Sequence, residues 1–134
     1  MSTYQLHEAR LRKWARGAYD TEAATELLIR TRWAGTEHPW VEDGWIDFNN
    51  ITEHIGGYSG GEQRLLRIAA SIGGDELVNL DDVIAGLDRR ILDLVLAALA
   101  HLGGSHQHSS PIFGADETIT GFTTEPNLHP WPGE

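Results

Sequence analysis

The segment Ser59-Gly60-Gly61-Glu62-Gln63-Arg64 has the residue types of a phosphate-binding helix start. Backbone N–H groups at a helix N-terminus lack partners within the helix, and the helix dipole favours an anion there. Glycines let a ligand approach this backbone closely, and an arginine adds positive charge. The segment therefore predicts an anion or nucleotide site that consists of Ser59, Gly60, Gly61 and Arg64.

The same letters also form an N-terminal capping box. In this motif the Ser59 hydroxyl accepts a hydrogen bond from the third helical N–H, while the Glu62 carboxylate accepts one from the Ser59 N–H. Both partners then lie within the chain, and no ligand is required. We favour this structural interpretation over the anion site.

Histidines gather toward the C-terminal third, where His101, His106 and His108 lie within eight positions. Imidazoles bind zinc or nickel, but these residues run from a helix end into a Gly/Ser loop and have no cysteine beside them. We expect exposed histidines, no metal site and no cofactor, although the sequence does not decide whether this group binds a metal. The chain contains no cysteine, which excludes disulfides and thiol nucleophiles.

The charge is strongly acidic, with a net value of −10. Residues 1–33 are the exception, because they hold six basic and four acidic side chains. A DNA-binding accessory role is therefore one alternative function, carried by the basic first helix through Arg10, Arg12, Lys13 and Arg16. The acidic remainder argues against nucleic acid as the main partner, since each phosphate contact requires a cation.

Aromatic residues outside helical patterns are candidates for a partner surface. Amphipathic rings in loops serve either as anchors onto the body of the protein or as hot spots for a partner. Packing onto the body is the favoured interpretation. The partner-binding candidates are Trp40, Trp45, Phe48 and Trp131.

Apolar periodicity predicts four or five helices, at about 3–19, 20–33, 59–72, 79–87 and 88–102. The last of these is apolar nearly all round, which predicts that it is the buried centre of the bundle. Residues 34–58 break the pattern and predict an aromatic-rich ordered loop, with a short strand near Val41–Ile46 and a helical turn near Asn50–Ile55.

Composition changes at Ser105, after which prolines, glycines and serines become frequent. We therefore divide the chain into a helical domain, 1–104, and an extended C-terminal tail, 105–134. The tail is either disordered or attached to the surface of the domain by its few apolar side chains. The predicted fold class is all-α.

Residues 58–100 resemble the signature segment of ATP-binding-cassette ATPases. Ser59-Gly60-Gly61-Glu62 matches the residues that face a nucleotide phosphate in that family, and Asp81-Asp82 followed by Gly86-Leu87-Asp88 is similar to its magnesium-binding aspartate and later turn. The resemblance implies nucleotide binding. No Gly-x-x-x-x-Gly-Lys-Ser/Thr motif is present, and the only lysine is Lys13, so we expect no ATPase activity. A decoy role, with this helix start docked against another protein's nucleotide site, is a further alternative.

Residues 10–108 also resemble a set of small uncharacterised actinobacterial proteins, some from phage or mobile elements. The resemblance is carried by the segment 19–30, the Trp40–Trp45 loop, the Ser59–Arg64 helix start and the segment 79–88. It implies a compact helical domain and brings no activity or site residues.

The absence of a nucleophile–base set, a metal cage and a phosphate loop argues against an enzyme. We expect a small acidic helical protein that acts through protein–protein contact with an unidentified partner, or with a second copy of itself. The longest apolar run is Leu94–Ala100, too short for a bilayer, and the N-terminus shows no signal pattern. The expected location is the cytoplasm.

Overall fold

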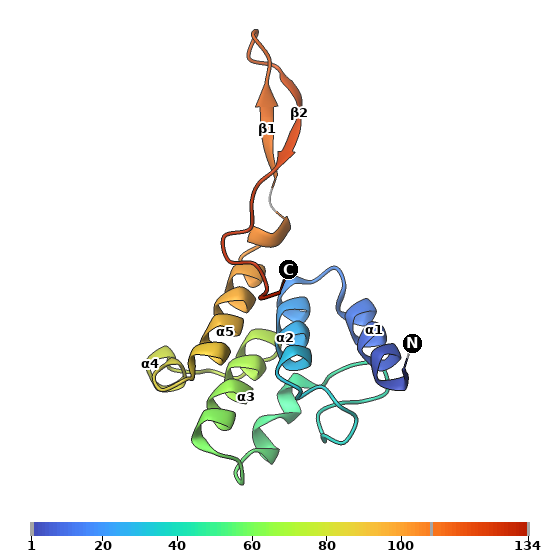
Figure 1. Cartoon of the computed structure of the whole chain (residues 1–134), viewed down its shortest axis with the longest axis vertical. Coiled ribbons are helices and arrows are strands. Elements are labelled where there is room, and N and C mark those ends of the chain that lie inside the picture. The colour runs from blue at the N-terminus through green and yellow to red at the C-terminus, as the bar shows by residue number, and fades with distance from the viewer. Residues whose placement is uncertain (1, 108, 134) are drawn as a thin grey trace.

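The computed structural model describes residues 2–107 and 109–133. Its helices are α1 (Thr3–Ala15), α2 (Tyr19–Arg30), α3 (Gly60–Gly73), α4 (Leu80–Ile84) and α5 (Arg89–Leu102). Two single 3-10 turns, η1 (Phe48–Asn50) and η2 (Thr52–His54), lie between α2 and α3, and a third, η3 (Ser105–Gln107), follows α5. An antiparallel hairpin then pairs β1 (Ser109–Phe113) with β2 (Ile119–Thr124). The protein is mostly helical, as predicted, but the hairpin makes the all-α prediction wrong (Figure 1).

Helix α2 lies at the centre of the bundle and packs against α1, α3 and α5 (Figure 1). Ala23, Ala24, Leu27 and Leu28 on this helix are fully buried. The expectation that α5 forms the buried centre is wrong. Its side chains Leu96, Leu99 and Leu102 are each about 40 % exposed, because α5 covers one side of α2 and leaves its outer face to solvent.

The last three helices begin next to the predicted positions 59, 79 and 88, and a side chain caps each of them. Ser59 and Glu62 form both bonds of the capping box on α3, while Asn79 caps α4 and Asp88 caps α5. The boundary between α1 and α2 differs from its prediction. Helix α1 ends at Ala15, before Gly17 with φ +104°, and α2 begins at Tyr19 without a side-chain cap.

The segment 34–58 is an ordered loop that buries Trp40 and Phe48 and leaves Trp45 partly exposed. Val41 and Ile46 form an antiparallel bridge, and η1 and η2 supply the predicted helical turn. Trp40 is fully buried, and its indole N–H donates to the carbonyl oxygen of Trp33 at 2.9 Å. A buried indole needs this partner, so the loop is fixed both by burial and by a hydrogen bond.

The C-terminal region forms a hairpin and then returns to the helices. The hairpin projects away from the helical body (Figure 1), and Trp131 in the returning segment is 4 % exposed. Ile119 to Thr124 contains β-branched and aromatic residues that favour a strand. The turn is closed by the Gly114 N–H, which donates to the Thr118 carbonyl, and by Asp116, which accepts from Thr118.

Among the described residues, no helix is long and apolar enough to cross a membrane.

Gly73 provides a test of the packing between α3 and its neighbours. A Cβ at this position would lie 2.7 Å from the Phe48 ring and 2.8 Å from the Ala24 Cβ. We expect Gly73→Ala to lower the free energy of unfolding by about 2 kcal/mol, because the core has no room for the methyl group. Urea titration followed by circular dichroism measures this change.

Gly61→Ala on the same helix is the control. A Cβ there would meet nothing within 4 Å, so we expect an unchanged or slightly higher stability, by at most about 1 kcal/mol. Equal destabilisation by both substitutions would contradict the close approach at Gly73.

A candidate cleft between three helices and the C-terminal segment

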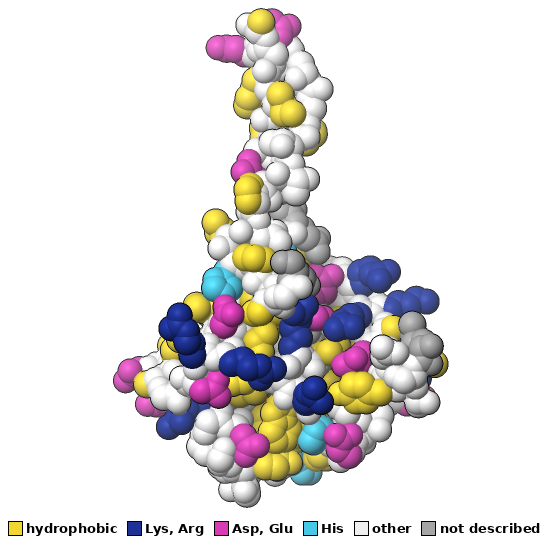
Figure 2. Space-filling view, viewed as in Figure 1, with side chains coloured by type: hydrophobic (Ala, Val, Ile, Leu, Met, Phe, Trp, Pro, Cys, Tyr) yellow, Lys and Arg dark blue, Asp and Glu magenta, His cyan; other side chains and the backbone are white. Residues whose placement is uncertain are grey.

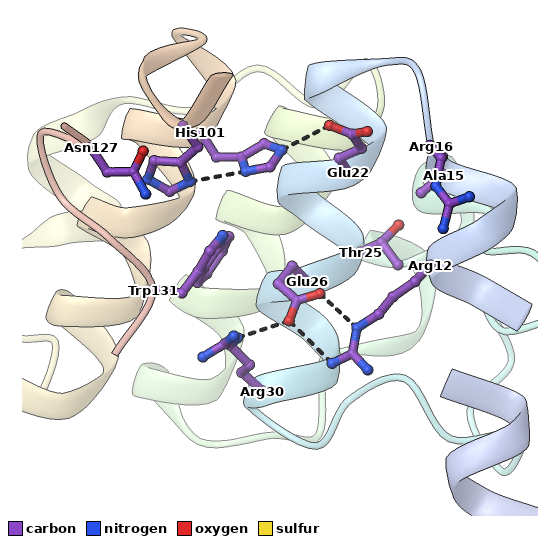
Figure 3. Close-up of a pocket in the computed structure, with 11 residues that line it drawn as sticks. Arg12, Ala15, Arg16, Glu22, Thr25, Glu26, Arg30, His101, Asn127 and Trp131 are labelled. Atoms are coloured by element: carbon purple, nitrogen blue, oxygen red, sulfur yellow. Dashed lines mark hydrogen bonds and ion pairs between the residues drawn. The ribbon is translucent and has the colours of Figure 1, made fainter. Parts of the chain in front are cut away.

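A cleft of about 470 Å³ lies between α1, α2, α5 and the returning C-terminal segment (Figure 3). Glu22, Thr25, Glu26 and Arg30 share one face of α2, because their spacings of three and four residues place them on one side of a helix. Arg12 on α1 and Arg16, which directly follows the end of α1, face the same cleft. The remaining walls come from Ala15, His101, His106, Asn127 and Trp131.

Glu26 is held by two arginines. Arg12 donates from Nε to one carboxylate oxygen at 2.9 Å and from Nη2 to the other at 3.1 Å, and Arg30 Nε donates at 2.8 Å. This bidentate geometry joins α1 to α2. Burial raises the pKa of Glu26, but the hydrogen bonds and charges of the two guanidinium groups outweigh it, and the net pKa is lowered.

Glu22 begins a chain of hydrogen bonds through two histidines. Its carboxylate lies 2.9 Å from His101 Nε2, His101 Nδ1 lies 3.1 Å from His106 Nδ1, and His106 Nε2 lies 2.8 Å from the carbonyl oxygen of His129. Burial alone raises the pKa of Glu22. The hydrogen bonds from the Gly17 N–H and His101, together with the charge of Arg16, outweigh burial, so the net pKa is lowered. Glu22 therefore acts as a carboxylate acceptor.

The partners of the two rings indicate which nitrogens donate. A carbonyl oxygen and a carboxylate only accept, so His106 Nε2 and His101 Nε2 are the donors in these two contacts. The two Nδ1 atoms face each other at 3.1 Å. The three contacts together connect Glu22 on α2 to the backbone of the C-terminal segment.

The C-terminal segment is attached to this network. Arg30 lies over the Trp131 ring, 5.1 Å from its centroid, and donates to the carbonyl oxygen of Pro132 at 2.8 Å. His129 Nε2 lies 2.7 Å from the Asp93 carboxylate on α5. The segment is thereby held by cation–π contact, charge-assisted hydrogen bonds and the burial of Trp131.

Thr25 is the one polar side chain of α2 that is fully enclosed, at 1 % exposure. Its hydroxyl has no hydrogen-bond partner within the described part of the chain. In Figure 3 it extends from α2 toward the α1 side of the cleft. A buried hydroxyl without a partner costs free energy, so this residue requires an explanation that packing does not provide.

The predicted anion site at Ser59–Arg64 lies on a different part of the surface from the cleft. Ser59, Gly60 and Gly61 are exposed, and the Ser59 hydroxyl and the Glu62 carboxylate satisfy each other's backbone N–H groups at 3.3 and 3.0 Å. The Arg64 guanidinium lies close to Gly60 and Gly86. The capping-box prediction is confirmed, because the backbone N–H groups of Ser59 and Glu62 both have side-chain partners within the chain.

The four basic residues predicted for nucleic acid lie on α1 or directly after it, in different environments. Arg10 pairs with Asp43 at 2.8 Å, and Arg12 pairs with Glu26. Arg16 lines the cleft and Lys13 is exposed. Two of these cations therefore already have carboxylate partners.

The four aromatic partner candidates are mostly inaccessible. Trp40, Phe48 and Trp131 are 5 % exposed or less, so the interpretation of these three rings as a contact surface is corrected: they are anchors in the core. Trp45 remains accessible, at 43 % exposure, and packs against Trp14 with ring centroids 6.5 Å apart.

The structure brings His101 and His106 together in the chain of hydrogen bonds that begins at Glu22. His108 lies outside the described residues. In the described ranges, no group of three or more His, Asp or Glu side chains has the arrangement of a metal site. The cleft itself is not predicted from the sequence. Its one available signal was the spacing of Glu22, Glu26 and Arg30 on one helical face.

The hairpin is a second candidate surface. The register pairs Pro111 with Phe122 and Phe113 with Ile119, so these four apolar side chains share one face. The register shifts between Ile112 and Phe113, where Thr120 on β2 has no register partner on β1. Ile119 and Phe122 are three residues apart and would point to opposite faces of a regular strand, and this bulge brings them to the same face. Phe113, Ile119 and Phe122 are each more than half exposed, and Figure 2 shows apolar side chains along the projecting hairpin.

No family model, curated protein or solved structure matches this chain. The resemblances to actinobacterial proteins and to the ATPase signature segment therefore stay predictions.

The two partly buried glutamates of the cleft, Glu22 and Glu26, predict acid sensitivity. Both have a pKa lowered below 4.5, so their stabilising contribution is complete above that value and is lost as the pH falls through the lowered pKa values. We expect Glu26→Gln to lower the free energy of unfolding at neutral pH by about 2 kcal/mol. We also expect its stability to decrease less steeply below pH 4.5 than that of the unmodified protein.

Urea titrations at a series of pH values measure both effects. Glu53→Gln is the matched control, because Glu53 is exposed on η2 and lies outside the cleft. If both variants followed the same pH profile, the ion pairs at Glu26 would not account for the acid sensitivity.

Proposed function

We propose that this protein acts through protein–protein contact, with the apolar face of the hairpin as its contact surface. The observation that carries the proposal is the gathering of Pro111, Phe113, Ile119 and Phe122 on one face that nothing in the described chain covers. A two-stranded hairpin is marginally stable in water unless its apolar face packs against another surface. A partner protein supplies that surface.

The edges of the hairpin favour the same role. Within the described part of the chain neither strand has a second neighbour, so each presents backbone donors and acceptors along its outer side. Pro111 removes one donor from β1, and prolines occur at sheet edges where the missing N–H faces outward. Strand β2 has no proline and is the edge at which a partner strand forms a continuous ladder.

Charge indicates the chemistry of the partner. The hairpin carries Asp116 and Glu117 at its turn and no lysine or arginine, and the whole chain has a net charge of −10. Two copies of such a chain repel each other, whereas a basic partner is attracted. The proposed partner is therefore a protein with an apolar surface flanked by lysine or arginine residues.

The other functions are less well supported. Self-satisfied caps weaken the case for an anion, nucleotide or decoy site at Ser59–Arg64. Carboxylate partners of Arg10 and Arg12 weaken the case for DNA binding by α1.

Site-specific photocrosslinking in the native cells tests the proposal. A benzophenone amino acid at position 122 places the reactive group on the apolar face, and the same group at position 77 replaces Leu77, which is 90 % exposed on the helical body. We expect a single basic protein to be attached at position 122 and not at position 77. An adduct with a second copy of this chain, or equal labelling at both positions, would refute the proposed partner.

A second variant carries Phe113→Ser together with the crosslinker at position 122, and tests whether the apolar face itself binds the partner. Burying a phenylalanine contributes about 2 kcal/mol, so we expect this substitution to weaken partner binding about 30-fold. Its melting temperature should not change, because the Phe113 side chain is 61 % exposed. An undiminished adduct with Phe113→Ser would count against the hairpin face.

A further inference from the structure

We propose that the cleft between α1, α2 and the C-terminal segment binds a small organic anion, whose phosphate or carboxylate group lies between Arg16 and Thr25. This site is separate from the hairpin face and does not depend on the function proposed for it.

The cleft is positive within an acidic protein. Three of the ten basic residues line it, namely Arg12, Arg16 and Arg30, and face two carboxylates, Glu22 and Glu26. An anion that reaches the cleft therefore meets a local charge opposite to that of the rest of the surface.

Both carboxylates are already engaged, and Arg16 is not. Glu26 accepts from Arg12 and Arg30, and Glu22 accepts from His101 and from the Gly17 N–H. Arg16 acts on Glu22 through its charge, but within the described ranges no hydrogen bond or salt bridge fixes its guanidinium. Its donors are available to a ligand, for which the guanidinium geometry suits carboxylate and phosphate oxygens.

Thr25 is the second, independent observation. A hydroxyl that is 1 % exposed and unpartnered is costly to retain, and valine has nearly the same shape without that cost. Thr25 lines the cleft beside Glu22 and Glu26 (Figure 3). A ligand oxygen within reach accepts its hydrogen and accounts for a polar group at this place.

Size and wall chemistry indicate an organic anion. A volume of about 470 Å³ lies within the range of small-molecule sites and far exceeds one phosphate ion. Ala15 and Trp131 provide apolar wall for the carbon part of the ligand. Glu22 and Glu26 on the α2 wall repel a polyanion, so the cleft does not suit a nucleic-acid backbone.

Calorimetric titration of the full chain with three probes tests the site. Phenyl phosphate and benzoate combine an aromatic ring with each of the two head groups, and inorganic phosphate has no carbon part. We expect binding of at least one ring-bearing anion, more tightly than inorganic phosphate, and its identity distinguishes a phosphate ligand from a carboxylate ligand. No heat and no change of melting temperature with either ring-bearing anion at millimolar concentration would overturn the proposal.

Two substitutions separate a specific contact from general charge. Arg16→Gln and Lys13→Gln each remove one positive charge near the end of α1, but only Arg16 lines the cleft. We expect Arg16→Gln to weaken binding about tenfold to a hundredfold, as for loss of a charged hydrogen bond, and Lys13→Gln to weaken it less than about twofold. Equal losses would show a diffuse charge effect and overturn the site.

Thr25→Val separates binding from folding. We expect about tenfold weaker binding together with an unchanged or higher melting temperature, because the substitution removes a hydroxyl that no protein group satisfies. A variant that binds the probe as tightly as the unmodified protein would overturn the placement of the head group at Thr25.

Discussion

The burial of α2 is the constraint on which the other elements depend. From Thr21 to Arg30 no side chain of this helix is exposed, yet the stretch includes two glutamates, two threonines and an arginine. One face of α2 is apolar and packs against α3 and α5. Its polar face is stable only if neighbouring elements supply partners, because an uncompensated charge in a protein interior is costly. Arg12 on α1 and His101 on α5 meet this requirement.

The same requirement determines the path of the C-terminal residues. His106 follows α5 and accepts or donates the proton that it shares with His101, while its other nitrogen holds the backbone of His129. Trp131 then packs its ring against the guanidinium of Arg30. Both ends of the hairpin are thus attached to the polar face of α2, which leaves the hairpin itself projecting beyond the helical body (Figure 1).

The features that are predicted correctly from the sequence depend on residues close together in the chain. Caps at Ser59, Asn79 and Asp88 depend on neighbouring residues only, and these helix starts are confirmed. The central position of α2 depends on which helices cover it, which the apolar pattern of α5 does not reveal. The hairpin falls in a segment rich in proline and glycine, where its strand residues are few and its register needs a bulge. The cleft unites residues 12 and 131, and no local pattern relates them.

The two proposed sites have no residue in common, but the chain connects them. The walls of the cleft include His106, which precedes β1, and Asn127 and Trp131, which follow β2. An anion in the cleft contacts residues at both ends of the hairpin, so its binding free energy includes any change in how those ends are held. Coupling between two sites is reciprocal: a partner that orders the hairpin changes anion affinity by the same factor that the anion changes partner affinity. Such coupling requires a differential contact in the two states, and the His106–His129 bond is the contact that links both ends directly.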